Sequence, residues 1–190
     1  MYAAAYDPYC YRGTSVLKNR LRTRNPDHLA AFEAEMVASR FDEALPAGRL
    51  SMSHYRAIHR HLFQDVYAWA GRFRTVRISK GGSTFAYPEH VPEAMRRLFA
   101  WLRMQRHLRG RPPERFAAEA AHFLAELNAI HPFREGNGRT QSTFFALLAA
   151  DAGHPLDLGR FIPNRFLAAM IASFRDDEAM LAAEIRSLIA

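Results

Sequence analysis

The sequence predicts an all-α fold, a bundle of about seven helices with one β-hairpin, and three observations carry this prediction. Apolar residues recur at the three- and four-residue spacing of helices through most of the 190 residues. Proline, glycine and capping side chains punctuate these stretches as helix starts and stops. An alternating, strand-like pattern occurs in one place only. The length fits one domain with a sizeable core, spanning residues 1–190.

The helices are expected to follow one another from residue 25 onward. Asn25-Pro26-Asp27 combines a capping side chain with proline at the first helical position, and this helix is expected to stop near Pro46. A second helix is expected to begin near Ser51 and to end at Gly71, a C-terminal cap. The remaining helices are predicted at about 88–108, 113–130, 139–153, 163–174 and 176–189.

The hairpin is predicted over residues 73–87. Val76 and Ile78 alternate with polar residues in the first strand, 73–79, and residues 84–87 form the second. Lys80-Gly81-Gly82-Ser83 between them is typical of a turn. An isolated hairpin is marginally stable, so we expect it to pack against the helices. Residues 1–24 are predicted to form an irregular N-terminal arm.

Composition narrows the class of protein. A net charge of +7 and a pI near 10.1 attract polyanions such as nucleotides, nucleic acid or acidic protein surfaces. The arginine-rich runs at 12–24 and 103–115 are not interleaved with aromatic residues, so nucleic acid is not the expected partner. One cysteine, Cys10, excludes an intrachain disulfide. With no signal-peptide pattern and no long apolar stretch, we expect a cytoplasmic protein without a membrane partner.

The stretch from His131 to Arg139, HPFREGNGR, lies between two predicted helices and indicates an anion-binding site. Gly136 and Gly138 allow successive backbone N–H groups to converge at the start of the second helix, where negative charge is favoured. Arg139 adds a guanidinium group at the same place. These residues predict that a phosphate-bearing ligand binds there.

Three further side chains in this stretch supply complementary chemistry. Glu135 is a hard oxygen ligand for a Mg²⁺ ion that bridges to phosphate. His131 is a base that works near neutral pH, and Phe133 is expected to fix the loop to the core. Together these groups favour phosphoryl-type transfer, in which positioning and charge neutralisation carry the catalysis. For any one residue alone, a structural role in a helix–loop–helix turn is the competing interpretation.

The same stretch contains the motif His-x-Phe-x-(Asp or Glu)-Gly-Asn-Gly-Arg at every specified position, and in this it resembles the Fic (Fic/Doc) family. Residues 58–87 are similar to the helix and flap hairpin that precede the motif in Fic proteins, and residues 6–21 to a common Fic opening. The resemblance implies a Fic-type helical bundle and protein adenylyltransferase (AMPylation) activity. In that reaction AMP passes from Mg-ATP to a Tyr, Thr or Ser hydroxyl of a target protein, and pyrophosphate is released.

The resemblance also implies roles for the matching residues, with 131–142 as the catalytic loop and the start of the following helix. His131 would deprotonate the target hydroxyl, and Glu135 would hold Mg²⁺ against the α- and β-phosphates. Arg139 would stabilise charge on the phosphates as pyrophosphate leaves. The remaining motif residues would cradle the phosphates through loop amides and the Asn137 side chain: Gly136, Asn137 and Gly138.

Phe133 would be structural, and the flap would clamp the target segment by strand pairing through Thr84, Phe85 and Ala86. A place for Phe85 in the core of the hairpin is an equally good interpretation.

The chain departs from the full Fic motif at one position. The second arginine, three residues after the first, is replaced by Ser142, and Arg160 and Arg165 are candidates to replace its charge. This departure leaves other functions open: a Fic-fold transferase that uses UTP, a CDP-linked group or phosphate transfer, or a weakly active basic binding protein.

Regulation is a further open point. The family's inhibitory pattern, (Ser or Thr)-x-x-x-Glu-(Gly or Asn), is incomplete at residues 39–44 because Ala44 ends it. A separate antitoxin-like inhibitory protein, as in a toxin–antitoxin pair, is therefore the expected regulator. Secretion as an effector is an alternative to a cytoplasmic location. Outside the motif, His54, His59 and His61 are interpreted as surface residues, since nothing near them completes a zinc site.

Overall fold

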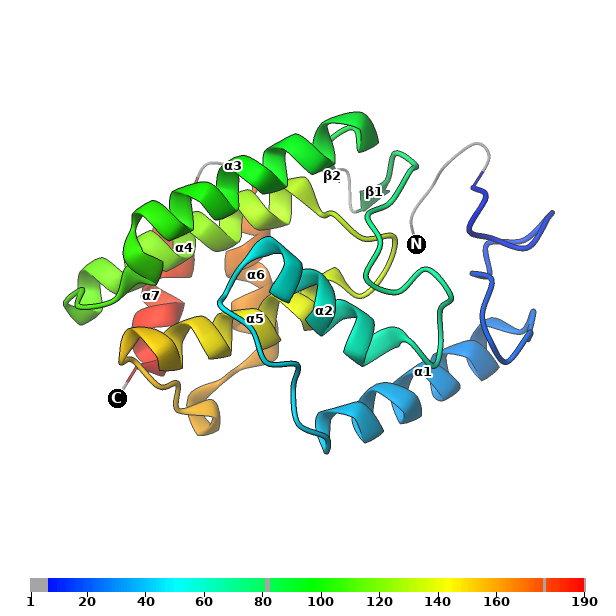
Figure 1. Ribbon diagram of the computed structural model, residues 1–190, viewed down its shortest axis with the longest axis horizontal. Helices are drawn as coiled ribbons and strands as arrows, with labels where there is room; N and C mark the ends of the chain where they lie inside the picture. The colour runs from blue at the N-terminus through cyan, green and yellow to red at the C-terminus, as the bar shows by residue number, and fades with distance from the viewer. Residues whose placement is uncertain (1–6, 81–82, 176, 190) are drawn as a thin grey trace.

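Seven α-helices and one short hairpin make up the computed structural model, which describes residues 7–80, 83–175 and 177–189 (Figure 1). The predicted fold class is confirmed. The helices are α1 (Pro26–Phe41), α2 (Met52–Phe63), α3 (Val91–Met104), α4 (Pro113–Ile130), α5 (Asn137–Ala152), α6 (Pro163–Ser173) and α7 (Ala179–Leu188). The strands are β1 (Ser79–Lys80) and β2 (Ser83–Thr84).

Local capping chemistry sets the starts of the first two helices, as the sequence predicted. The Asn25 side chain accepts hydrogen bonds from the backbone N–H groups of Asp27 and His28, and Pro26 follows the cap. The Ser51 hydroxyl accepts a bond from the backbone N–H of His54 at the start of α2. These bonds satisfy N–H groups that have no acceptor inside the helix.

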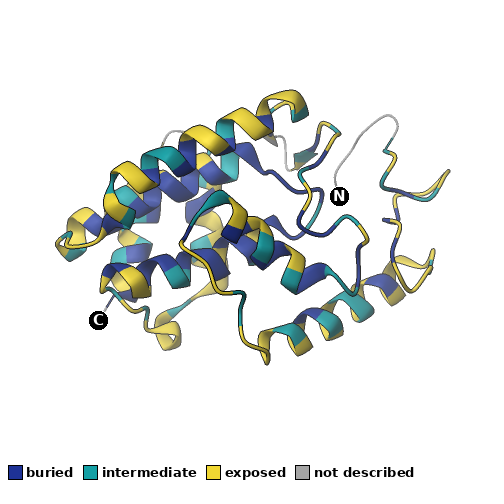
Figure 2. Ribbon diagram, in the orientation of Figure 1, coloured by how far each residue is buried: buried dark blue, intermediate teal, exposed yellow. Residues whose placement is uncertain are grey.

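The core forms where α4 packs against α3, α5, α6 and α7, and where α2 packs against α5. Buried faces of these helices turn inward in Figure 2. An aromatic cluster lies at the centre, with the Phe144 ring 5.4 Å from Tyr55 and 5.5 Å from Phe99. In the described residues, no helix combines the length and the apolar character that a membrane span requires. The core thus holds α4 and α5, the helices on either side of the motif.

Three helices end earlier than predicted, and the first of them, α1, ends at Phe41 with Asp42 as its C-cap instead of near Pro46. The helix α2 ends at Phe63 instead of Gly71, because the chain then folds back against it: the Gly71 backbone N–H donates to His59 Nδ1 and the Arg56 guanidinium donates to the Gly71 carbonyl. The helix α3 ends at Met104 instead of residue 108. Residues 106–108 have positive φ angles, and this reversal buries the side chain of Leu108.

The hairpin strands are also shorter than predicted. They pair only Ser79 with Thr84 and Lys80 with Ser83, so the two ends of the turn predicted at residues 80–83 are strand residues, and residues 81–82 lie outside the described residues. Arg74 explains the difference: its buried guanidinium donates to the carbonyls of Val76 (2.7 Å) and Ala86 (2.5 Å). A side chain therefore takes acceptors that a longer strand ladder would have used.

The N-terminal arm lies against the motif loop. Its described part, residues 7–24, contains one antiparallel bridge between Cys10 and Leu17. The buried carboxylate of Asp7 pairs with the buried guanidinium of Arg134 at 2.6 Å. Arg134 also donates to the Cys10 sulfur, and burial, followed by the charge of Asp7, raises the pKa of that thiol. The arm therefore helps to fix the loop between α4 and α5.

Candidate active site

The motif loop is a sharp connection between α4 and α5, with left-handed backbone at both ends. His131 follows α4 with φ 46° and ψ 63°, and Gly136 precedes α5 with φ 80°. A Cβ atom at Gly136 would lie 2.4 Å from the Phe63 ring, so both the backbone angle and the close packing require glycine there. The strained angle of His131, a residue that rarely adopts positive φ, marks the loop as a functional candidate.

Buried groups hold this loop in one conformation. The Asn137 side chain accepts from the Phe133 backbone N–H at 2.9 Å and donates to the Phe133 carbonyl at 2.8 Å. The buried Phe133 ring stacks on His59, with 3.7 Å between ring centroids. His59 Nε2 in turn donates to the Glu135 carbonyl at 3.0 Å. The Asn137 side chain is thus used inside the loop, which limits its phosphate contact to the backbone N–H.

His59 and His54 correct the surface interpretation made from the sequence. Both imidazoles are buried, and His54 contacts the Pro46 carbonyl through Nε2. Burial lowers the pKa of His59 to about 3, so the ring is neutral. It accepts from the Gly71 N–H at Nδ1 while donating to the loop at Nε2. The His59 ring therefore supports the motif loop through its contacts with Phe133 and Glu135, a role that no local sequence pattern indicates.

His131 presents a neutral imidazole to a pocket. Its Nδ1 lies 3.2 Å from the Asn128 carbonyl, which can only accept, so Nδ1 carries the proton and Nε2 keeps a lone pair. Burial, and then the charges of Arg74 and Lys80, lower the pKa of His131 to about 3. The Phe85 ring stacks on the imidazole with centroids 3.8 Å apart. His131 is thus held in the protonation state that a general base requires.

The pocket has a volume of about 550 Å³ and two different walls. The polar wall is the motif loop with the start of α5: His131, Glu135, Gly136, Asn137, Gly138 and Arg139. The apolar wall is α6 with the residues beside it: Phe161, Phe166, Leu167, Met170, Ile171 and Phe174. The size and the few convergent polar groups are typical of a small-molecule site.

Glu135 and Gly138 leave room on the polar wall for a charged ligand. Glu135 Oε1 accepts from the Gly136 backbone N–H at 2.9 Å, which fixes the carboxylate at the pocket. A Cβ atom at Gly138 would meet no atom within 4 Å beyond its own turn of helix and its chain neighbours, so the space beside this glycine is open. In the described residues, no group of three or more His, Cys, Asp or Glu side chains could hold a metal ion. Any metal here would depend on Glu135 together with ligand oxygens.

Arg139 reaches the pocket from the first turn of α5. Its guanidinium lies over the Phe63 ring, 4.7 Å from the centroid, and Nη2 pairs with Glu33 Oε1 on α1 at 2.5 Å. Ser142 also lines the pocket. The candidates to replace the missing second arginine lie elsewhere: Arg160 pairs with Asp157 and Arg165 with Glu184, and neither lines the pocket. Lys80, from β1, lines it instead.

The flap residues are placed differently from one another. Phe85 is buried against His131 and the edge of Phe174, the position of a hairpin core aromatic. The Ala86 N–H donates to the Ala129 carbonyl at the end of α4, and its own carbonyl accepts from Arg74. Thr84 is exposed on β2. The hairpin is therefore attached to the end of α4, directly beside His131.

Sequence reasoning missed three charged residues that build this site: Arg74, Arg134 and Glu33. Arg74 donates to the carbonyls of Ile130 and His131 as well as to the hairpin. Arg134, at an unspecified position of the motif, pairs with Asp7. Since their side-chain partners lie 34 or more residues away and the other acceptors are backbone carbonyls, spacing along the chain gave no signal for any of them.

Comparison with known proteins identifies the family. The Fic/DOC family model matches residues 49–149, more than half of the chain. A Sinorhizobium fredii protein named "Probable protein adenylyltransferase y4lH" is 53% identical over 189 residues, which cover 99% of this chain and 98% of that protein. Protein adenylyltransferase VbhT of Bartonella schoenbuchensis is 35% identical over 97% of this chain, which spans 39% of its length. The chain belongs to the Fic/DOC family.

A solved structure agrees with this assignment. The N-terminal Fic domain of a VirB-translocated effector protein from Bartonella quintana, with bound ADP, superposes with a TM-score of 0.86 at 27% identity. The alignment covers 96% of this chain and 94% of that one. The predicted class of enzyme, a protein adenylyltransferase, is confirmed by the named relatives.

Proposed function

We propose that this chain, acting as one domain over residues 1–190, transfers AMP from Mg-ATP to a Tyr, Thr or Ser hydroxyl of a target protein. The observation that carries the proposal is the neutral His131 imidazole, held beside the helix start of α5 in a pocket of nucleotide size. The family assignment and the ADP bound to the Bartonella quintana relative support the choice of nucleotide.

Phosphates would bind at the start of α5. The backbone N–H groups of its first turn have no acceptor within the helix, and the helix dipole favours an anion there. The open space at Gly138 leaves room for phosphate oxygens, and Asn137 contributes its backbone N–H. Arg139 adds positive charge on the same side of the pocket. The triphosphate is thereby oriented along the polar wall.

Glu135 would hold Mg²⁺. The fit is good because Mg²⁺ is commonly bound through one or two carboxylates, with substrate phosphates and water completing its shell. One fixed carboxylate at the pocket meets that requirement. When bound, the ion would neutralise charge on the phosphates and orient them.

His131 would act as the general base. Nε2 takes the proton from the target hydroxyl while the oxygen attacks the α-phosphorus. A new P–O bond forms, the bond from the α-phosphorus to the bridging oxygen breaks, and pyrophosphate leaves with that oxygen. The Asn128 carbonyl, which accepts from Nδ1–H, stabilises the imidazolium that results. Arg139 stabilises the charge that builds on the departing phosphates.

The two remaining surfaces of the pocket would receive the base and the target. The apolar wall offers flat aromatic and aliphatic contacts to the nucleotide base. The target segment would pair with the hairpin around Thr84, Phe85 and Ala86, with Phe85 acting mainly as the support of His131. This arrangement directs a target hydroxyl toward Nε2.

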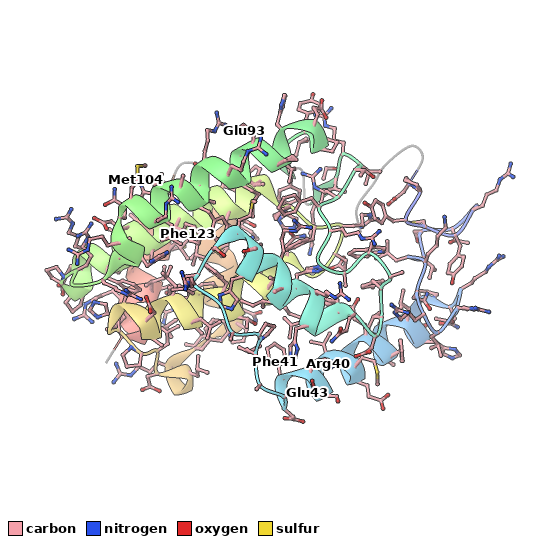
Figure 3. All side chains as sticks on the ribbon, viewed as in Figure 1. Arg40, Phe41, Glu43, Glu93, Met104 and Phe123 are labelled. Carbon is pink, nitrogen blue, oxygen red and sulfur yellow. The ribbon has the colours of Figure 1, made fainter. Side chains whose placement is uncertain are left out.

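We place regulation in a separate antitoxin-like protein, with the chain as the toxin of the pair in the cytoplasm. Residues 39–44 do not line the pocket, and Glu43 pairs instead with Arg40 at the end of α1 at 2.8 Å (Figure 3). Secretion is the alternative setting, since several structural relatives are described as VirB-translocated effectors. Coexpression of the chain with small neighbouring-gene products, scored by growth, tests the toxin proposal.

A transfer assay tests the activity itself. Lysate proteins incubated with wild type should gain label from α-³²P-ATP but not from γ-³²P-ATP. His131→Ala should reduce transfer at least about 100-fold with folding retained, because the general base is lost. His28→Ala, an exposed histidine on α1, is the matched control and should behave as wild type. A folded His131→Ala enzyme with full activity would overturn the mechanism.

A further inference from the structure

Arg139 is held in place by α1, a helix none of whose residues line the pocket. Glu33, in the middle of α1, uses its two carboxylate oxygens for two different partners. Oε1 accepts from Arg139 Nη2 at 2.5 Å, and Oε2 accepts from the Tyr67 hydroxyl. Glu33 itself does not line the pocket, and its side chain is only 14% exposed. A largely buried carboxylate thus contacts the motif arginine from outside the pocket.

The contact engages one part of the guanidinium and leaves the rest available. A guanidinium group has five N–H donors in one plane, and the bond to Glu33 uses Nη2. The Phe63 ring lies under the same group and restricts its tilt. Tyr67 in turn restricts the carboxylate, so the hydroxyl, the carboxylate and the guanidinium form a chain of fixed orientation. Arg139 also lines the pocket, where its remaining N–H donors could meet a ligand.

The orientation of Arg139 matters more here because Ser142 stands where a second arginine is usual in the motif. Among the described residues that line the pocket, Arg139 is the one arginine. Its donors therefore have to be aimed without help from a neighbouring guanidinium.

We propose that Glu33 is a positioning residue that aims Arg139 at the phosphates beyond the α-phosphate, with Tyr67 holding the Glu33 carboxylate in place. The inference rests on the proposed function, since it assigns Arg139 to the leaving pyrophosphate. It predicts that loss of Glu33 weakens the hold on the β- and γ-phosphates while leaving the rest of the nucleotide site intact.

The test compares Glu33→Ala and Glu33→Gln with Glu35→Gln, which removes a similar charge from the exposed face of the same helix. Calorimetry would measure the affinity for Mg-ATP and for AMP, which lacks the two outer phosphates, and a transfer assay would give kcat and KM. Glu33→Ala should weaken Mg-ATP binding and lower kcat about tenfold each, the scale of one charge-assisted hydrogen bond, with AMP affinity within about twofold of wild type. Glu33→Gln, which keeps the side-chain volume, should show the same selective loss.

Two controls make the outcome decisive. Tyr67→Phe keeps the carboxylate next to Arg139 and should lose less than about threefold, whereas Glu35→Gln should match wild type. Equal losses for ATP and AMP would show general distortion of the site and overturn the proposal. Higher transfer in Glu33→Gln would also overturn it, because the contact would then be inhibitory. Absence of transfer in wild type would refute the proposed function, while the ATP-to-AMP affinity ratio would still decide the role of Glu33.

Discussion

The two walls of the pocket are built in opposite ways. On the polar wall, the groups that would do chemistry are held by partners that are buried or half-buried: His131 by Asn128 and Phe85, Arg139 by Glu33. On the apolar wall, Leu167 and Ile171 are 59% and 50% exposed and project from a helix surface. The polar wall is complete before any ligand arrives, whereas Leu167 and Ile171 on the apolar wall would be buried only by something that covers them.

This difference teaches what each wall contributes to an enzyme. Catalysis requires charges and dipoles that do not have to reorganise during the reaction, and a buried hydrogen-bond network provides that rigidity. Binding of an apolar surface depends mainly on the apolar area that is removed from water, and this contribution does not depend on precise orientation. Substitutions on the polar wall should therefore affect the rate together with metal and phosphate binding, whereas substitutions on the apolar wall should affect the affinity alone.

The largest effect is expected at Glu135 on the polar wall. Among the described residues that line the pocket, Glu135 is the one carboxylate, and Glu135→Ala should weaken Mg²⁺-dependent ATP binding about 100-fold, on the scale of two charge-assisted bonds. Calorimetry with and without Mg²⁺ measures this loss. Glu126→Ala, an exposed position on α4, is the control. Unchanged affinity for Mg-ATP would exclude Glu135 as the metal ligand.

A second, gain-of-function change tests whether the polar wall lacks a cation. Ser142→Arg places a guanidinium one turn beyond Arg139 on the same face of α5 and should improve kcat/KM for ATP about tenfold. Ser142→Gln, long but neutral, should not. If Ser142→Arg has no effect on ATP affinity or turnover, either Lys80 already supplies the charge or the natural donor is not ATP. A donor screen with UTP, GTP and CDP-linked compounds separates these outcomes.

The apolar wall should respond in KM and not in kcat. Leu167→Ser removes an aliphatic surface that a bound base would cover, worth about 1 kcal/mol for partial burial, and should raise KM for ATP about fivefold. Steady-state kinetics measures both constants. Met180→Ser, an equally exposed apolar residue on α7, should leave them unchanged. A fall in kcat at constant KM would contradict the division between the two walls.

The smallest effect is expected in the pH dependence of folding stability, to which the two buried histidines His59 and His131 contribute. His59 and His131 have pKa values lowered to about 3 by burial, so between pH 3 and 6.5 the unfolded chain binds protons that the folded chain does not. Stability therefore falls as pH falls through 6.5, by about 0.8 kcal/mol per histidine between pH 7.5 and pH 6. Urea unfolding at both pH values measures this. His59→Gln should remove about half of the pH dependence, and the exposed control His28→Gln none of it.

Much of this fold could be predicted from the sequence because its signals are local. Caps such as Asn25 and Ser51 bond to residues two or three positions away, so both the signal and its partner lie in one short window. The motif is equally local, because Asn137 closes the loop on Phe133 four residues before it. The starts of α1, α2, α4 and α6 were therefore predictable, whereas α3 and α7 each begin three residues later than predicted and α5 begins two residues earlier.

Polar contacts between residues far apart in the sequence could not be predicted from local patterns. The helix α2 ends early because Gly71 turns back to His59, and the hairpin is short because Arg74 replaces its ladder. Glu33 reaches Arg139 across 106 residues. Each of these depends on which surfaces the folded chain brings together, and a charged or imidazole side chain looks the same in sequence whether it becomes buried or stays in solvent.

Arg74 has a consequence for how a target residue would be chosen. Its one guanidinium bonds both to the hairpin, at Val76 and Ala86, and to the end of α4, at Ile130 and His131. Under the proposed function, the hairpin that would dock the target and the histidine that would act as base are therefore held at a fixed distance from each other. Along an extended target segment, side chains on one face repeat about every 6.6 Å, so a shift by two residues carries a hydroxyl out of range of Nε2. Under the proposed function, the modified position is measured by its distance along the segment, which allows different hydroxyl residues to be accepted at the same place.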